Sequence, residues 1–203
     1  MKLYGCANSR SLRALWALEH AGAPYEYHHV DLFRGEGSGA AFRALNPAGK
    51  VPVLVDDDFT LTESAAIVAY IGERHPACGL VPDDVTGRAD YWRWCSFIIT
   101  ELEQPLWTIA KHRFILPKAQ RVPAIEATAV WEFAHAAALL AAGLKDRNFI
   151  LKQILTGADI LAVHTLAWAR SARVPLGDPT LEAYLDRLGS EPALLRAREV
   201  EKR

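Results

Sequence analysis

The sequence lacks the features of secreted, metal-stapled and membrane-spanning proteins. Its three cysteines, Cys6, Cys78 and Cys95, are odd in number and have no Cys-x-x-Cys spacing. They fit neither a disulfide framework nor a zinc site, so no metal is expected. No basic-then-apolar leader opens the chain, and no run of about 18 uninterrupted apolar residues occurs. We therefore expect a cytoplasmic protein with no membrane partner.

The chain also lacks an excess of charge of one sign. The chain has 203 residues, of which 23 are Lys or Arg and 24 are Asp or Glu, for a net charge of −1. This balance gives no basic patch for a nucleic acid. Only residues 196–203 are dense in charge, and because their signs alternate we expect a solvated tail. The length suits one domain or two small ones.

Strand and helix patterns alternate in the N-terminal part. A short strand at 2–5 leads into the helix-capping run Asn8-Ser9-Arg10-Ser11 and a helix that ends at Gly22. A strand at 25–31 follows, which implies a right-handed parallel crossover. A loop, a short helix at 40–45, a turn at 46–49, two strands and a helix from 63 to 75 complete the pattern. The order βαβ-α-ββα predicts an α/β domain with a mixed four-stranded sheet.

The stretch from Lys50 to Ile67 has the features of a ligand site. Pro52 has no N–H to donate and stands where a strand begins. If the Val51–Pro52 peptide is cis, the Val51 backbone groups are free to pair with an extended ligand. The helix that opens at Glu63-Ser64 presents free N–H groups to a carboxylate. An ordinary hairpin with a capped helix is the alternative.

Helical periodicity fills the second half of the chain. After a Pro-, Gly- and Asp-rich linker at 76–84, helical runs occupy 86–112, 119–144, 156–173 and 179–188. Thr156 and Asp159 form a capping box with a hydrophobic staple. We interpret this pair as structural, and expect that loss of Asp159 costs about 1 kcal/mol or more.

Five motifs follow one another over nearly the whole chain. They are Asn8-Ser9-Arg10-Ser11, Asn46-Pro47-Ala48-Gly49-Lys50-Val51-Pro52, Glu63-Ser64-Ala65-Ala66-Ile67, Thr156-Gly157-Ala158-Asp159-Ile160 and the closing helices from Tyr184 to Leu195. In this order they resemble the glutathione S-transferase family. The resemblance implies a thioredoxin-like domain at 1–76, a linker at 77–86, and an all-helical domain at 87–203 that carries the electrophile pocket. It also implies a homodimer.

The resemblance implies how glutathione is held. Val51 would pair through its backbone with the cysteinyl part, beside a cis bond at Pro52. Ser64 would donate to the γ-glutamyl carboxylate, and Glu63 would receive the γ-glutamyl ammonium. Lys50 would lie near the glycyl end, or would be a solvated surface charge.

The group that activates the thiol is open among three residues. Family members use a Tyr, Ser or Cys near the start of the first helix, and no Cys falls there. Ser9 is the first choice because a hydroxyl at a helix start can donate to a thiolate. Asn8 and Ser11 are the alternatives, with plain helix capping as a further interpretation of both serines. Cys6 is the nearest sulfur, but at a strand end it is more often an inert thiol.

Large aromatic and mixed-polarity residues near the end of the first long C-terminal helix are candidates for the electrophile pocket. They are Trp107, His112 and Phe114, with core packing as the alternative for each. His28 and His29 do not predict a metal site, because neighbours in a strand point to opposite faces.

The sequence therefore predicts a glutathione transferase, with glutathione as co-substrate, whose thiolate attacks a small hydrophobic electrophile. One alternative is a glutathione-dependent reductase, peroxidase or isomerase that uses Cys6 or the thiolate. The other is a glutathione-transferase-like binding module without turnover.

Overall fold

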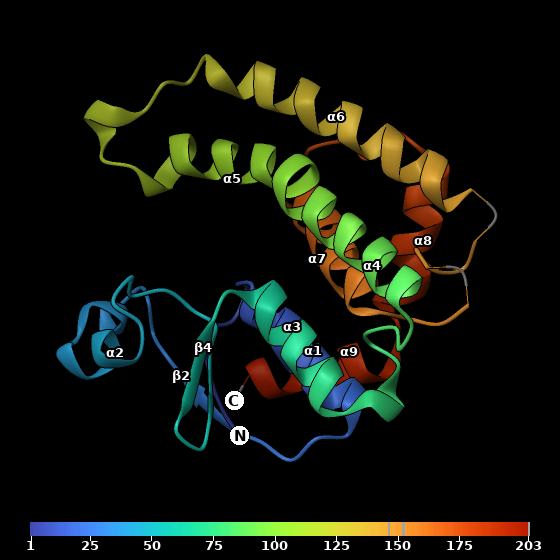
Figure 1. The fold of residues 1–203 in the computed structure, drawn as a ribbon. Coiled ribbons are helices and arrows are strands. Elements are labelled where there is room, and N and C mark those ends of the chain that lie inside the picture. Colours follow the sequence, from blue (N-terminus) through green and yellow to red (C-terminus); the bar gives the residue numbers. More distant parts are fainter. Residues whose placement is uncertain (146, 152, 203) are drawn as a thin grey trace. The chain divides into compact units, whose positions relative to one another are not determined.

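The structure is a computed structural model that describes residues 1–145, 147–151 and 153–202. It contains two compact units, drawn together in Figure 1. Unit 1 comprises Met1–Asp83 and Gly189–Arg203, and unit 2 comprises Asp84–Leu188. The last residues thus fall in unit 1, whereas the resemblance implied that they belong to the helical domain.

Unit 1 is built on a mixed four-stranded sheet, as the sequence predicted. The strands are β1 (Lys2–Gly5), β2 (Glu26–His29), β3 (Val53–Asp56) and β4 (Phe59–Thr62), in the order β2-β1-β3-β4. β1 runs parallel to β2 and antiparallel to β3, and β3 and β4 form a hairpin. The parallel pair follows from the helical crossover between β1 and β2.

Helices cover both faces of this sheet. α1 (Ser11–Ala21) and α3 (Ser64–Arg74) pack against each other and against the strands. Leu3 and Leu54, which face each other across β1 and β3, have no exposed surface. The alternate residue Val53 packs instead with Phe42 of α2 (Ala40–Leu45), since successive side chains of a strand point to opposite faces.

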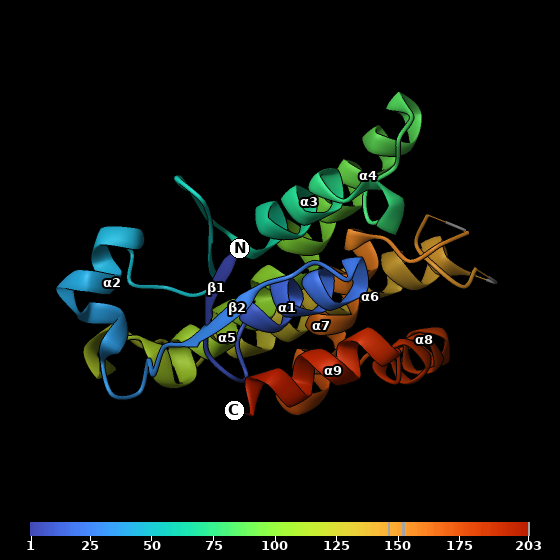
Figure 2. The same cartoon turned by 90° about the horizontal axis from the view of Figure 1, so that it is seen from below.

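The expected solvated tail is wrong. Residues Pro192–Glu201 form the helix α9, which Figures 1 and 2 both place alongside α1. Ala193, Leu194 and Ala197 are buried on the side of α9 that packs in unit 1. Alternating charges hid this helix, because its buried stripe consists of small residues and a single leucine.

Unit 2 is helical, as predicted, with differences at the helix ends. The run expected at 86–112 consists of α4 (Val85–Phe97) and α5 (Gln104–Ala110), each followed by a π-helical segment, Ile98–Glu103 and Lys111–Ile115. α6 (Ile125–Leu144) begins six residues after the predicted start, because Pro123 ends the preceding turn. α7 (Gly157–Ser171) and α8 (Pro179–Gly189) follow.

Asp159 joins three parts of unit 2. Its Oδ2 accepts the N–H of Thr156 at 2.8 Å and the Thr156 hydroxyl at 3.0 Å in a capping box at the start of α7. Its Oδ1 accepts the Ile150 N–H at 2.9 Å and the Tyr184 hydroxyl of α8 at 2.7 Å. Complete burial raises the pKa of Asp159 although these four bonds oppose the shift.

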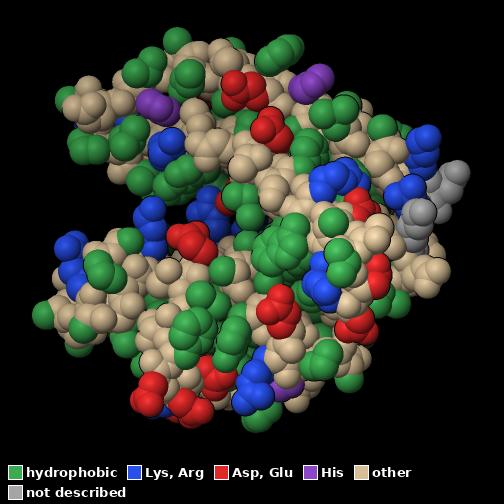
Figure 3. Space-filling view, viewed as in Figure 1, with side chains coloured by type: hydrophobic (Ala, Val, Ile, Leu, Met, Phe, Trp, Pro, Cys, Tyr) green, Lys and Arg blue, Asp and Glu red, His purple; other side chains and the backbone are tan. Residues whose placement is uncertain are grey.

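α6 is long and apolar enough to cross a membrane by length and composition. Phe133 and Leu140 are fully buried within unit 2, so a core helix also accounts for its apolar residues. On the face shown in Figure 3, basic and acidic side chains are interspersed rather than gathered by sign.

Candidate functional site

Three segments named by the sequence meet at one end of the sheet. Tyr4 pairs with Val53, and Val53 pairs with Thr62. The register therefore brings the end of β1, the start of β3 and the end of β4 to the same end of the sheet. The loop at 6–11, the Val51–Pro52 peptide and the start of α3 at Glu63-Ser64 emerge there. This is the set of residues in which the resemblance placed glutathione.

The loop between β1 and α1 is held by its own hydroxyl groups. The Ser9 hydroxyl donates to the Cys6 carbonyl at 2.6 Å, and the Ser9 Oγ accepts the Ser11 N–H at 3.1 Å. Ser11 has no exposed surface, and its Oγ accepts the Cys6 N–H at 3.2 Å. Asn8 is exposed and has a φ of 57°, in the left-handed region. Of the three candidate donors, Ser11 is enclosed, Ser9 is engaged and Asn8 faces outward.

The Val51–Pro52 peptide is cis. No backbone hydrogen bond to Val51 occurs within the described part of the chain. The buried side chain of Asn46 shapes the approach to this peptide by donating to the Lys50 carbonyl at 2.7 Å and accepting the Ala48 N–H at 3.0 Å. The Lys50 side chain is exposed.

The start of α3 carries a buried guanidinium that the sequence did not reveal. Arg13 of α1 is 1 % exposed, and its Nη1 donates to the Ser64 Oγ at 3.2 Å. No acceptor for the Ser64 hydroxyl proton is present among the described residues. Because Ser64 accepts from Arg13, its own proton is available to a ligand. The neighbouring Glu63 is exposed and has a φ of 68°, which is rare for a residue with a side chain.

Arg13 was missed because the first helix was interpreted by its apolar positions alone. A basic residue in an amphipathic helix normally faces solvent. Its partner, Ser64, lies 51 residues away in the sequence. The pattern Leu12-Arg13-Ala14-Leu15 does place Arg13 next to buried positions, which was the one available signal.

Cys6 is 5 % exposed at the end of β1, in agreement with a buried structural thiol. Cys95, in α4 of unit 2, is also buried, and burial raises its pKa to about 12. The described residues contain no group of three or more His, Cys, Asp or Glu side chains that could hold a metal ion.

The three residues predicted to line an electrophile pocket lie on unit 2. Trp107 and His112 are half-buried, and Phe114 is 63 % exposed. His112 lines a cavity of about 310 Å³, whose other lining residues are Ile109, Arg113, Arg121, Pro123 and Glu126. Trp107 and Phe114 are not among them, so this cavity does not bring the three together.

The cavity beside His112 has a fixed polar wall. The His112 Nδ1 accepts the Val122 N–H at 3.0 Å, which assigns the ring proton of the neutral imidazole to Nε2. Arg113 donates to both carboxylate oxygens of Glu126, and this pairing lowers the pKa of Glu126. The ring is therefore oriented rather than free to turn.

Comparison with known proteins identifies the family. The profile described as "Glutathione S-transferase, N-terminal domain" matches residues 1–73. Glutathione S-transferase GST-4.5 of Xanthomonas campestris is 30% identical over 203 residues, which cover 99% of this chain and 98% of that protein. Glutathione S-transferase 1 of Dianthus caryophyllus is 39% identical over 119 residues. That match spans 58% of this chain and about half, 53%, of the Dianthus protein.

Solved structures agree over the full length. A ternary complex of BphK, a bacterial glutathione S-transferase, has a TM-score of 0.88 at 29% identity and covers 100% of both chains. A sphingomonad glutathione S-transferase complexed with glutathione has a TM-score of 0.86 at 29% identity, covering 100% of this chain and 99% of that one. The chain belongs to the glutathione S-transferase family.

Proposed function

We propose that this protein is a glutathione transferase that binds glutathione in unit 1, at the end of the sheet where these three segments emerge. The observation that carries the proposal is the Arg13–Ser64 hydrogen bond at the start of α3. The guanidinium supplies a buried positive charge and orients the Ser64 hydroxyl as a donor. Free N–H groups at the start of α3 add to it. A γ-glutamyl carboxylate suits this set of donors.

The other proposed contacts with glutathione lie at the same end of the sheet. The Val51 backbone would pair with the cysteinyl part of glutathione beside Pro52, and Glu63 would accept the γ-glutamyl ammonium. The left-handed φ of Glu63 supports a functional role, because such backbone outliers cluster at ligand sites. Lys50 would lie near the glycyl carboxylate, for which its exposed ammonium is suited.

We propose that the loop at 6–11 activates the glutathione thiol, with Asn8 as the first hydrogen-bond donor to test. The Ser9 hydroxyl would have to leave the Cys6 carbonyl before it could donate to sulfur, and Ser11 is enclosed. The exposed amide of Asn8 has no such competing partner among the described residues. Lowering a thiol pKa of about 8.5 by two units requires about 2.7 kcal/mol, which hydrogen bonds and a helix terminus can supply.

The thiolate would then attack a small hydrophobic electrophile. A carbon–sulfur bond forms, and either a leaving group departs with its electron pair or a conjugate acceptor is protonated. His112, Trp107 and Phe114 are proposed to bind the electrophile. We also propose a cytoplasmic homodimer, which sedimentation of the purified protein would check.

Binding is tested with Ser64→Ala. We expect glutathione affinity, measured by calorimetry, to fall at least about tenfold because a carboxylate loses a charge-assisted bond. Ser96→Ala, an exposed serine of α4, is the matched control and should bind as the wild type does. Equal affinities for the two variants would contradict the site.

Activation is tested by the ultraviolet thiolate band of bound glutathione, titrated against pH. Asn8→Ala should raise the apparent thiol pKa more than Ser9→Ala does, and the reverse order would restore Ser9. A wild-type value equal to that of free glutathione would indicate a binding module without turnover. Loss of thiol-disulfide exchange in Cys6→Ser would instead favour the redox alternative.

A further inference from the structure

A cavity outside the candidate glutathione site lies beside β2, an edge strand of the sheet. Its volume is about 670 Å³, and it is lined by α1, by α9 and by residues in and just before β2, all within unit 1. None of its lining residues belongs to the three segments proposed to hold glutathione. We propose that this cavity, the β2–α9 cavity, binds a planar aromatic molecule that carries a positive charge.

Three ring side chains form one wall of the β2–α9 cavity. Tyr25, Tyr27 and His29 alternate along the chain at β2, so all three project to the same side of the sheet. Tyr27 pairs with Leu3, which places this wall on the face of the sheet opposite α2. The Tyr27 hydroxyl is buried and lies against Gly5, so this side chain presents its ring to the cavity. Such a wall suits a flat ligand, because aromatic rings stack with offset faces.

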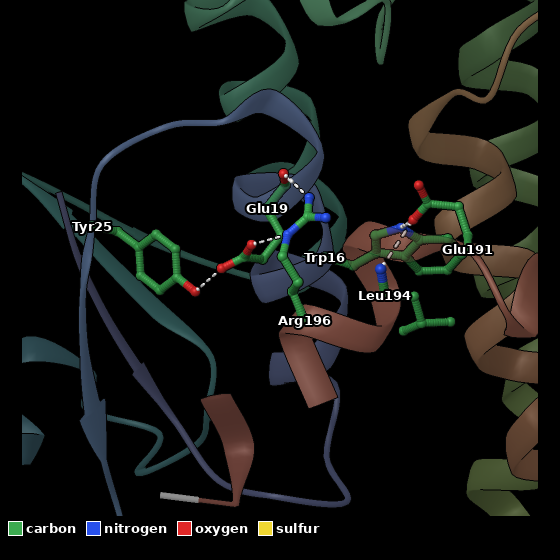
Figure 4. Close-up of polar contacts among 6 residues, drawn as sticks. All are labelled: Trp16, Glu19, Tyr25, Glu191, Leu194 and Arg196. Carbon is green, nitrogen blue, oxygen red and sulfur yellow. Dashed lines mark hydrogen bonds and ion pairs between the residues drawn. The ribbon is translucent and has the colours of Figure 1, made fainter. Parts of the chain in front are cut away.

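A hydrogen-bond network around Glu19 fixes the shape of the β2–α9 cavity. The Glu19 carboxylate accepts the Tyr25 hydroxyl at 2.6 Å and the Arg196 Nε at 2.8 Å, and the Glu19 carbonyl accepts the Arg196 Nη2 at 3.1 Å. Figure 4 shows Tyr25 and Arg196 meeting at this carboxylate. The Trp16 Nε1 holds α9 further by donating to the Glu191 carboxylate at 2.8 Å. The cavity is therefore preformed, as small-molecule sites usually are.

The charges that line the β2–α9 cavity favour a cation. Two of the lining residues are carboxylates, Glu19 and Glu199, and one is a guanidinium, Arg196, which Glu19 already balances. Glu199 pairs with Lys202 at 2.5 Å, but their side chains are 65% and 68% exposed, and such a surface pair contributes little. The Glu199 carboxylate can therefore exchange this partner for a cationic ligand. The tyrosine rings attract the same charge.

The volume and the apolar contacts set the size of the ligand. Pockets for small molecules hold about 300 to 1,000 Å³, and the β2–α9 cavity, at about 670 Å³, lies within this range. Val200 lines it from α9, and the methylene stem of Arg196 adds apolar surface. A molecule of two or three fused aromatic rings, with a nitrogen that is protonated at neutral pH, meets these requirements.

Proflavine, a planar three-ring cation, is the probe for this site. Its fluorescence polarisation is titrated with purified protein in the presence of excess S-hexylglutathione, so that binding is read away from the candidate glutathione site. We expect saturable binding, and binding at least about tenfold weaker for acridine-9-carboxylate, which carries a negative charge on the same ring system. No saturable binding, displacement by S-hexylglutathione, or equal affinities for the two dyes would overturn the proposal.

Ring variants locate the dye. Tyr25→Leu removes part of the aromatic wall and should weaken proflavine binding about tenfold. Tyr70→Leu is the matched control, because Tyr70 is also half-buried and also donates to a carboxylate, that of Asp56, but does not line the cavity. Tyr25→Phe keeps the ring and should bind within about twofold of wild type. Equal affinities for Tyr25→Leu and Tyr70→Leu would overturn the proposal.

A charge variant tests the preference for a cation. Glu199→Gln should weaken proflavine binding about threefold, a small effect because the carboxylate is exposed. Glu73→Gln, at an exposed position of α3, removes the same charge away from the cavity and should bind as the wild type does. Equal affinities for these two variants would overturn the assignment of a cationic ligand.

A last measurement reads the position of the dye in the unaltered protein. The methyl resonances of Val200 should shift when proflavine is added, because a stacked aromatic ring beside them changes their shielding. The methyl resonances of Val85, an exposed valine at the start of α4, should stay in place. Unchanged Val200 signals at saturating dye would overturn the site.

Discussion

Two carboxyl groups whose pKa is raised by burial, one in each unit, differ in the hydrogen bonds that they accept. Asp159 accepts four hydrogen bonds in unit 2. Glu201 of unit 1 is half-buried, and its Oε1 is buried without a hydrogen-bond partner among the described residues. Burial raises the pKa of both. Hydrogen bonds offset the burial of the Asp159 carboxylate, whereas the buried Oε1 of Glu201 accepts none within the described part of the chain.

The two regions also differ in how their partners are supplied. Thr156 and Asp159 are three residues apart, so a local motif creates most of that site. The contacts that dock α9 on α1 join residues separated by 175 to 177 positions. Local sequence specifies the first site, and only the completed fold specifies the second.

The largest expected effect is at Asp159. Asp159→Ala would leave the Thr156 and Ile150 N–H groups and the Tyr184 hydroxyl without their acceptor in a fully buried place. We expect a loss of about 3 kcal/mol in the free energy of unfolding, seen as a fall of about 6–12 °C in the thermal midpoint. The exposed Asp186→Ala is the control. A shift no larger than that of the control would show that the bonds around Asp159 are dispensable.

A smaller loss is expected at the start of α9. The Glu191 Oε2 caps the helix through the Leu194 N–H at 3.0 Å and also accepts from the buried Trp16. Glu191→Ala should cost about 2 kcal/mol in urea denaturation. Glu199→Ala, on the exposed side of α9, should cost almost nothing. If both variants unfold at the same urea concentration, the docking of α9 does not depend on this carboxylate.

Replacing Glu201 should stabilise the protein, in contrast to the losses expected at Asp159 and Glu191, and the gain should depend on pH. Its folded pKa, about 7, lies above the reference value of 4.5, so the native state binds more protons between these pH values and stability falls as pH rises. Glu201→Gln should therefore match wild type below pH 4.5. Above pH 7 it should be more stable by about 1 kcal/mol, a value reduced for partial solvent screening.

Thermal midpoints at acidic and alkaline pH check this sign. Stabilisation that is equal at both would mean that Glu201 does not titrate in the fold. Glu199→Gln controls for the change in net charge.

The smallest effect is at Arg196. It is 55% exposed where it meets Glu19, so Arg196→Gln should cost less than about 1 kcal/mol, and less still at high salt. Lys202→Gln, another exposed basic residue of the same region, is the comparison. A loss of more than about 2 kcal/mol would place this ion pair with the buried contacts of α9 rather than with its surface.

Most of the fold was predictable because its signals are local. Alternation, the Pro52 strand start and the Gly22 helix end specified the sheet and helices of unit 1. Pro123 did indicate that α6 begins late, but the helical periodicity of the sequence favoured a start at 119. The π-helical segments Ile98–Glu103 and Lys111–Ile115 had none, since their side chains keep a helical spacing.

The candidate site was predictable only in its outline. The segments at 8–11, 51–52 and 63–64 were named from sequence, and the sheet register brings them to one end of the sheet. Arg13 was not named, because it contacts the site through Ser64, which lies 51 residues away in the sequence. The engagement of the Ser9 hydroxyl by Cys6 also needed coordinates, since sequence gives residue types but not hydroxyl partners.

Unit 1 is interrupted in sequence: residues 84–188 intervene between its two parts. A ribosome therefore delivers the sheet, the 6–11 loop and α1 well before α9 emerges. Until then Trp16 lacks Glu191, and Glu19 lacks Arg196. The nascent sheet domain must wait for more than a hundred residues of synthesis before α9 can pack on α1. A fragment cut at the sheet domain's own boundary would remain in that unfinished state.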